Sequence, residues 1–131
     1  MTDIRLLDEN DLDAINNLQK NLGYREINKI PGCIFGYFSD GNLVGIIGIF
    51  PYERLPHKDY PNGKLAEIGA LYVNDKYRNQ GIATKLLQSA MDYSKKLKLD
   101  ACVIDCTDMS YDIFKTAGFE NSTEHRMWKV L

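Results

Sequence analysis

Long apolar runs are absent from this sequence of 131 residues, and no stretch approaches the roughly 20 apolar residues that a membrane-spanning helix needs. Residues 1–12 carry acidic side chains where a signal peptide would be basic and then apolar. A strong charge of either sign is also lacking, since the formal net charge is −2. The chain as a whole therefore has no electrostatic attraction to nucleic acid or to an anionic membrane. We expect a cytoplasmic protein with neither as a partner.

Cysteine is scarce, and its pattern argues against a zinc site and against a disulfide between Cys102 and Cys106. Cys33, Cys102 and Cys106 are odd in number and do not have the spacing of a zinc site. In an extended strand, Cys102 and Cys106 would lie about 13 Å apart at roughly 3.3 Å per residue. A disulfide needs a Cα separation of roughly 4.4 to 6.8 Å. We expect free thiols and no bound metal.

The usual nucleotide-binding fingerprints are missing too. Neither G-x-G-x-x-G nor G-x-x-x-x-G-K-[ST] occurs, which disfavours a classical dinucleotide or P-loop fold. Hydrophobic residues make up 44% and charged residues 26%, an ordinary globular composition rather than that of a disordered chain. With no linker, repeat or low-complexity stretch, residues 1–131 are expected to form a single domain.

The first half of the chain predicts a strand, a helix and a hairpin. Residues 4–7 have strand character, and residues 8–23 predict a helix that begins at an Asp8 cap and ends at Gly23. Two apolar runs within residues 33–50 flank Asp40-Gly41, which is a hairpin signal. Three prolines and Asn62-Gly63 mark residues 51–63 as a loop.

The second half alternates strands and helices. Residues 64–73 predict a strand interrupted by Gly69, which suggests a bulge or a close approach to the backbone. Helical spacing begins at Gly81, residues 100–106 predict a buried strand, and residues 108–118 a short helix from an Asp108 cap to Gly118. Residues 124–131 predict a last strand. The element order β-α-β-β-β-α-β-α-β indicates a mixed α/β fold.

Residues 78–83 lie where the strand ending at Val73 gives way to the helix. The first turn of a helix has N–H groups without partners and carries part of a positive charge, which suits a phosphate. Gly81 lets an anion approach the backbone, and Arg78 and Lys85 add local positive charge. Two interpretations remain at this point, an anion-binding loop and an ordinary turn.

These residues, Arg78-Asn79-Gln80-Gly81-Ile82-Ala83, match the Q/R-x-x-G-x-G/A loop of the GNAT superfamily of N-acetyltransferases, which the chain resembles. The segments AEIGALYVNDKYRNQGIATKLL and FKTAGF are similar to the family's fourth strand, loop and third helix, and to its late helix ending in Gly-Phe. The firm matches cover residues 66–119, and the element order agrees along essentially the whole chain.

The resemblance implies a mixed, mostly antiparallel sheet of six to seven strands, flanked by three to four helices and splayed around a coenzyme cleft. It also implies acetyl-CoA as the acetyl donor and an amine as the acceptor. The pantetheine arm would pair with the backbone of Leu71, Tyr72 and Val73. The pyrophosphate would be held by the loop and the first turn of the helix. The coenzyme-binding positions implied are Leu71, Tyr72, Val73, Arg78, Asn79, Gln80, Gly81, Ile82, Ala83, Thr84, Phe114 and Lys115.

Acetyl transfer to an amine needs a base, because an alkylamine with a pKa near 10.4 is about one part in a thousand free base at pH 7. Glu67 matches the position of the catalytic glutamate in the histone acetyltransferase branch of the family. It is equally compatible with a strand glutamate that faces solvent or pairs with a lysine.

A general acid for the departing thiolate is harder to assign. Many relatives have a tyrosine four residues before the glycine of the Gly-Phe pair, where this chain has Phe114, which cannot donate a proton. Tyr111, one turn earlier, either substitutes as the acid or contacts the coenzyme and packs. Cys106 could also be a nucleophile, but direct transfer is the habit of the family.

The acceptor site is expected among residues 22–33, 50–63 and the segment after Phe119, which contain the acidic residues Glu26, Glu53, Asp59, Glu120 and Glu124. Two functions from different classes remain: an acetyltransferase acting on a primary amine of a small molecule or protein, and a catalytically weak CoA-binding sensor or interaction module. The resemblance leaves a homodimer open. The sequence does not identify the acceptor.

Overall fold

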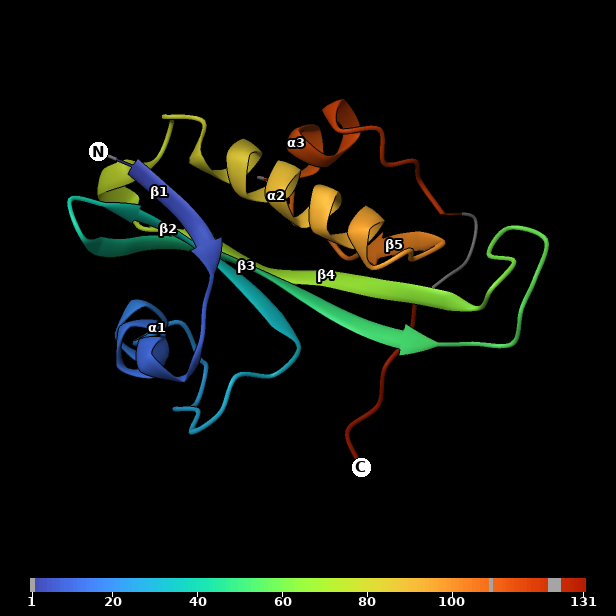
Figure 1. Cartoon of the computed structure of the whole chain (residues 1–131), viewed down its shortest axis with the longest axis horizontal. Coiled ribbons are helices and arrows are strands. Elements are labelled where there is room, and N and C mark those ends of the chain that lie inside the picture. Colours follow the sequence, from blue (N-terminus) through green and yellow to red (C-terminus); the bar gives the residue numbers. More distant parts are fainter. Residues whose placement is uncertain (1, 109, 123–125) are drawn as a thin grey trace.

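Five strands form one sheet, with helices on both of its faces (Figure 1). The computed structural model describes residues 2–108, 110–122 and 126–131. The strands are β1 (Thr2–Leu6), β2 (Cys33–Ser39), β3 (Asn42–Glu53), β4 (Lys64–Val73) and β5 (Ala101–Ile104). The α-helices are α1 (Leu12–Leu18), α2 (Ile82–Lys96) and α3 (Tyr111–Thr116), and 3-10 turns occupy Glu9–Asp11 and Asp75–Tyr77.

The sheet is mixed and mostly antiparallel, as the resemblance implied. Its strands lie in the order β1-β2-β3-β4-β5, with three antiparallel pairs and a parallel pair between β4 and β5. The helix α2 provides the crossover that a parallel pair requires. The number of elements differs from the prediction: among the described residues there are five strands and three α-helices, where the resemblance implied six to seven strands and three to four helices.

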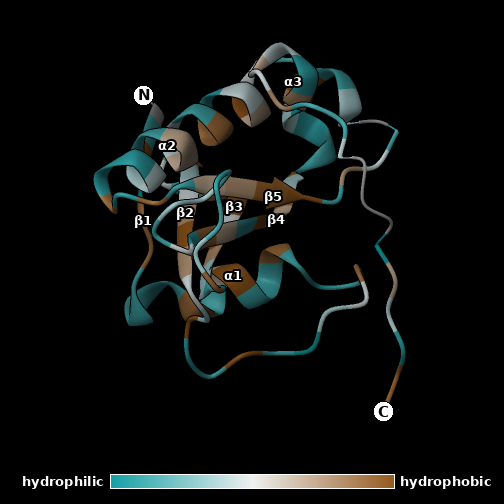
Figure 2. Ribbon diagram, turned by 90° about the vertical axis from the view of Figure 1, so that its right-hand side faces the viewer, coloured by the Kyte–Doolittle hydropathy of each residue, from teal (hydrophilic) through white to brown (hydrophobic). Residues whose placement is uncertain are grey.

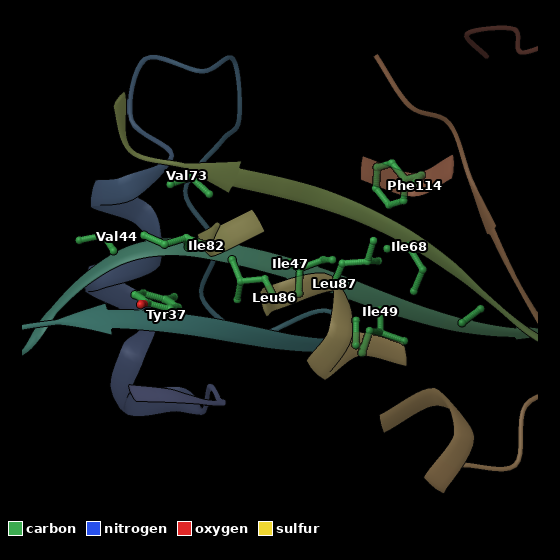
Figure 3. Close-up of a cluster of buried hydrophobic side chains, with 12 residues drawn as sticks. Tyr37, Val44, Ile47, Ile49, Ile68, Val73, Ile82, Leu86, Leu87 and Phe114 are labelled. Carbon is green, nitrogen blue, oxygen red and sulfur yellow. The ribbon is translucent and has the colours of Figure 1, made fainter. Parts of the chain in front are cut away.

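Successive residues of the central strands pack on opposite faces of the sheet. Ile47 and Ile49 belong to the core beneath α2, whereas Ile46 belongs to the smaller core beneath α1. Figure 3 shows the larger cluster, in which side chains from β2, β3, β4 and α2 meet Phe114 of α3. In Figure 2, hydrophobic stretches lie along the strands of the sheet, and the helices beside it carry both hydrophilic and hydrophobic residues. Burial of these apolar side chains is the main force that holds the helices against the sheet.

The predicted hairpin is confirmed, but its second strand is longer than expected. Asp40 and Gly41, both with positive φ, join β2 to β3. The strand β3 continues through Pro51 to Glu53, so that part of the predicted loop is in fact strand. Pro51 is tolerated because the pairing of β3 with β2 stops at Ile49, opposite Cys33, the first residue of β2. That edge of β3 therefore has no strand partner at Pro51.

The first helix is shorter than residues 8–23. Asp8 caps the 3-10 turn, accepting a hydrogen bond from the backbone N–H of Asn10, and the α-helix runs from Leu12 to Leu18. Asn21 adopts a φ of 71°, in the left-handed region, so the helix ends before Gly23. Asp11 is buried and accepts two hydrogen bonds from the Arg5 guanidinium, at 2.9 and 2.8 Å.

Two predictions near the C-terminal end need correction. Ser110, not Asp108, precedes the first residue of α3, although Gly118 follows the helix with the expected positive φ. The predicted last strand is wrong for residues 126–131, which form no strand, and residues 124–125 lie outside the described residues. The pattern of these residues suits a strand, but a strand also needs a partner edge, and the segment pairs with none in the described structure.

Candidate functional site

The strand β4 carries a bulge at the position that Gly69 predicted. Ile46 pairs with Tyr72 and Gly48 pairs with Gly69, so two residues of β4, Ala70 and Leu71, oppose a single residue of β3. Ala70 has a φ of 52°, which costs an alanine about 1 kcal/mol or more. Bulges of this kind occur next to active sites, where they redirect the chain. Local strain held by a central strand is a physical indication of a functional position.

Beyond the bulge, one edge of β4 is free of any described strand. The parallel pairing with β5 ends at Ile68 and Ile104, while β4 continues for five more residues to Val73. The opposite edge stays paired, because Val73 lies across from Gly45 of β3. The two strands thus separate and expose backbone hydrogen-bonding groups of β4 to an extended ligand. The predicted pantetheine positions, residues 71–73, lie on this free edge.

The loop predicted to bind pyrophosphate contains two residues in the left-handed region. Asn79 has a φ of 64° and Gly81, which precedes α2, has a φ of 77°. No side chain caps this end of the helix, and the first helical hydrogen bond runs from the N–H of Lys85 to the carbonyl of Gly81. The N–H groups of Ile82, Ala83 and Thr84 thus have no helical acceptor. A Cβ built on Gly81 would meet no atom within 4 Å, so the space above the loop is open.

Arg78 fixes this loop to the end of β4. Its Nε donates a hydrogen bond to the carbonyl of Val73 at 3.1 Å, and its Nη2 pairs with Asp75 at 2.9 Å. The guanidinium also lies over the ring of Tyr72, 5.7 Å from the ring centre. These contacts hold a cation beside the open space and keep the loop in register with the free strand edge.

The bulge, the free edge and the loop all line a single cavity of about 780 Å³, which we call the cleft. It is closed on the other side by the end of β5 and by α3. Its lining residues are Tyr24, Ile68, Gly69, Ala70, Leu71, Tyr72, Val73, Tyr77, Arg78, Asn79, Gly81, Ile82, Ala83, Thr84, Ile104, Asp105, Thr107, Ser110, Ile113 and Phe114.

Ten of the twelve predicted coenzyme positions line the cleft, and two do not. Gln80 is exposed and outside the lining, and Lys115 lines a different cavity on the far side of α3. Tyr111, the candidate acid, also faces that other cavity, where its hydroxyl donates to Asn121 Oδ1 at 3.0 Å. Phe114 is buried and borders both cavities. The reason is rotation along the helix: residues 110, 113 and 114 share one face, and residues 111 and 115 share the next.

Ten lining residues are not among the predicted coenzyme positions: Tyr24, Ile68, Gly69, Ala70, Tyr77, Ile104, Asp105, Thr107, Ser110 and Ile113. Ser110 and Ile113 could have been found from helical spacing, because they lie on the face of Phe114. Asp105 follows β5 directly, at the point where the strands separate. Tyr24 comes from the segment between α1 and β2, and no local pattern connects it with the loop.

Glu67, the candidate base, lies on the face of β4 that points away from α2. Its neighbours Ala66 and Ile68 are buried under α2, and Glu67 is level with Phe50 of β3 and Val103 of β5. Its side chain is 42% exposed and does not line the cleft.

The Glu67 carboxylate is bound by a guanidinium from the C-terminal segment. Arg126 Nη2 donates to Glu67 Oε1 and Oε2 at 3.3 and 3.2 Å, and Arg126 Nε pairs with Asp105 Oδ2 at 2.9 Å. The hydrogen bonds to Glu67, followed by the charges of Glu67 and Asp105, raise the pKa of the Arg126 guanidinium above its ordinary value. One of the two roles predicted for Glu67 was that of a strand glutamate paired with a lysine. Glu67 does have a cationic partner, but this partner is Arg126.

A second cavity of about 680 Å³, which we call the outer cavity, lies along β5. Asp105, Ile104 and Phe114 line both cavities, so the two are neighbours. Tyr52, Asp59, Glu120 and Arg126 are among the other residues of the outer cavity, which therefore includes two acidic residues of the predicted acceptor region.

The cysteines are free thiols, as expected, and Cys106 is exposed at the outer cavity. Among the described residues, no three His, Cys, Asp or Glu side chains gather as metal ligands. The described part of the chain also has no helix that is long and apolar enough to cross a membrane.

Comparison with known proteins finds similarity to one family of acetyltransferases. The family model for the acetyltransferase (GNAT) family matches residues 5–119. A predicted acetyltransferase from Clostridium acetobutylicum, determined with acetyl-CoA, is similar with a TM-score of 0.85 and 16% identity, covering 98% of this chain and 96% of its own.

Two further solved structures share the fold. A GCN5-related N-acetyltransferase from Ralstonia eutropha gives a TM-score of 0.82 at 20% identity, covering 100% of this chain and 99% of its own. A glucosamine-6-phosphate N-acetyltransferase from Arabidopsis thaliana gives 0.82 at 16% identity, covering 99% and 98%. No curated protein matches the sequence.

Proposed function

Because the chain belongs to the GNAT family of acetyltransferases, we propose that it moves an acetyl group from acetyl-CoA to a primary amine by direct transfer. The acceptor is an amine of a small molecule or of a protein. The observation that carries the proposal is the cleft, in which the bulged, half-free strand β4 meets an open helix N-terminus. Each part corresponds to a different part of the coenzyme.

The residues of the cleft fit acetyl-CoA as a cosubstrate. The unpaired N–H groups at the start of α2 are suited to the pyrophosphate, and the absence of a Cβ at Gly81 leaves room for it. Arg78 supplies a cation beside the loop, its charge shared with Asp75. The free edge of β4 is suited to the amides of the pantetheine arm. The thioester brought into the cleft supplies the activated acetyl group.

Direct transfer forms an amine N–C bond and breaks the thioester C–S bond. The acceptor loses a proton and the departing sulfur gains one, so the proton balance closes within the site or through water. We assign the base to Glu67, acting through a water, because its carboxylate shares the Arg126 guanidinium with Asp105, which borders the cleft.

No side chain is assigned as the acid. Phe114 has no ionisable proton, and the hydroxyl of Tyr111 is engaged with Asn121 beside the outer cavity. Departure of the thiolate would then depend on water or on the dipoles of backbone N–H groups.

A second function, a CoA-binding module with weak catalysis, is favoured by one specific observation. The guanidinium of Arg126 occupies both carboxylate oxygens of Glu67, so the candidate base is already hydrogen-bonded. A protein in which that contact is permanent would bind the coenzyme without using it.

One experiment separates the two functions. Purified protein is incubated with isotope-labelled acetyl-CoA and a panel of primary amines that includes diamines, amino sugars and peptides, and acetylated products are sought by mass spectrometry. Calorimetry measures CoA binding in parallel, with Gly81→Glu as the matched negative control. Labelled product supports the transferase. CoA binding without any product supports the module, and the absence of both contradicts both.

A further inference from the structure

The polar contacts between the C-terminal residues 126–131 and the rest of the described structure come from one side chain. Within residues 126–131, Arg126 alone makes hydrogen bonds or ion pairs to the described residues, and its contacts go to Glu67 and Asp105. The residues that follow are exposed, Met127 to 89% and Trp128 to 86%. Figures 1 and 2 both show this end of the chain running away from the sheet. Among the described residues, the polar contacts that hold this segment are those of a single guanidinium, and Met127 also lines the outer cavity.

The attachment point borders both cavities. Asp105 lines the cleft and the outer cavity, and Arg126 lines the outer cavity. Glu67 lies on the face of β4 that points away from α2. It is next to Ile68, the last residue of β4 that pairs with β5. Arg126 thus joins two carboxylates at the place where β4 and β5 begin to separate, which is also where an acceptor would have to approach the thioester in the proposed function.

The charges at this point favour a cation. Two carboxylates share one guanidinium, so the group of three carries one net negative charge. All three side chains are roughly half exposed, at 42% for Glu67, 59% for Asp105 and 52% for Arg126. Ion pairs of this exposure are weak because water screens them, so another cation can replace the guanidinium. An anionic acceptor would be repelled by the carboxylates as soon as Arg126 left.

We propose that Arg126 is an internal competitor of the acceptor: it holds the place, between Glu67 and Asp105, that the ammonium group of a cationic alkylamine takes on binding. This inference rests on the proposed function and specifies its substrate class. The incoming ammonium donates its hydrogen bonds to the two carboxylates, and residues 126–131 move into solvent. Displacement also frees Glu67 to accept a proton, so the base becomes available only when an acceptor is present.

Steady-state kinetics test the competition. Arg126→Gln removes the internal cation, and we expect the KM for a cationic acceptor to fall by about three- to tenfold with kcat within about twofold of wild type. Arg126→Lys, which keeps a cation, should remain closer to wild type. Lys129→Gln removes the same charge from the same exposed segment and should change neither constant. An unchanged or raised KM in Arg126→Gln overturns the proposal, and a fall in kcat at constant KM shows instead that Arg126 positions Glu67.

A binding measurement tests the inference without turnover. In CoA-loaded protein labelled with ¹⁵N-arginine, the Nε–H signal of Arg126 is identified by its loss in Arg126→Gln. Titration with 1,4-diaminobutane at constant ionic strength should shift or broaden that signal, and 1,4-butanediol should not. No response to the diamine, or an equal response to the diol, overturns the inference. A response to the diamine in a protein that acetylates no amine would support the inference and contradict the proposed function.

Discussion

The Nε of Arg78 lies 3.1 Å from the carbonyl oxygen of Val73 and donates a hydrogen bond to it, which ties the loop before α2 to the last residue of β4. The pairing joins the two parts of the cleft that would hold different ends of the same coenzyme. Removing it should therefore loosen the loop as well as remove a cation.

We expect Arg78→Ala to raise the Kd for CoA by about five- to thirtyfold, equivalent to roughly 1 to 2 kcal/mol. Lys76→Ala, which removes an exposed cation two residues earlier, should leave the Kd within about twofold. Isothermal titration calorimetry measures both. Equal effects in the two variants would mean that general positive charge, and not the contact with Val73, matters.

Gly81→Glu should weaken CoA binding by at least about tenfold, or about 1.4 kcal/mol. The new carboxylate would stand in the open space above the loop and repel a pyrophosphate. Gly41→Glu is the matched control, because Gly41 has a similar φ of 81°, would also have no atom within 4 Å of an added Cβ, and lies in the β2–β3 turn. Both variants should lose similar stability, and only Gly81→Glu should lose CoA. Undiminished affinity in a folded Gly81→Glu protein contradicts the loop assignment.

Tyr111→Phe should change kcat by less than about threefold. The Tyr111 hydroxyl hydrogen-bonds to Asn121 and borders the outer cavity, so its removal takes away a surface contact and no proton donor. An acid in direct use would instead lose a factor of about 10² to 10⁴. Initial rates with saturating acetyl-CoA give the answer, and a loss of a hundredfold or more at constant KM would make Tyr111 the acid.

Glu67→Gln should lower kcat strongly, by about a hundredfold at pH 7, with partial recovery as the pH rises toward the pKa of the amine. The amide keeps the size of the side chain but removes the basicity and the charge. Glu53→Gln, an exposed change on the neighbouring strand β3, serves as the control. The measurement is kcat against pH for the three proteins. Overlapping profiles for wild type and Glu67→Gln would leave Glu67 as a structural partner of Arg126.

Asp11→Asn should destabilise the fold by roughly 1 to 3 kcal/mol at pH 7, because a buried, charged hydrogen-bond acceptor is lost. The hydrogen bonds from Arg5 hold the pKa of Asp11 below its ordinary range. Its contribution is therefore complete above the pKa of an unfolded aspartate and disappears as the pH falls through the lower value in the folded protein. Urea unfolding at pH 7 and pH 3 checks this, with the exposed Asp13→Asn as control. A difference between variant and wild type that persists at low pH would contradict the assignment.

Local signals predicted the parts of the site that are local in the chain. The strand β4 has the predicted bounds, its bulge lies next to Gly69, and α2 begins directly after Gly81. Each of these follows from a few neighbouring residues: strand character, a glycine interruption, a turn and then helical spacing. The loop could be located for the same reason.

Contacts between distant segments could not be predicted in this way. Glu67 and Arg126 are 59 positions apart, and nothing in either neighbourhood indicates the other. The exposed residues Met127 and Trp128 alternate as a strand would, yet pairing depends on the rest of the fold. For α3, the prediction was wrong about which face of the helix borders the cleft. Successive side chains on a helix are about 100° apart, and Tyr111 and Lys115 lie on the face that borders the outer cavity.

The separation of β4 from β5 also affects which amino-acid substitutions this part of the protein can tolerate. Along residues 69–73 the groups presented at the free edge are peptide N–H and C=O, which every residue other than proline carries alike. Substitutions there alter side chains while the edge itself persists, provided that the bulge is kept. The part of the strand that we propose to bind the coenzyme is thus the part on which residue identity bears least, and a search for invariant side chains would overlook it.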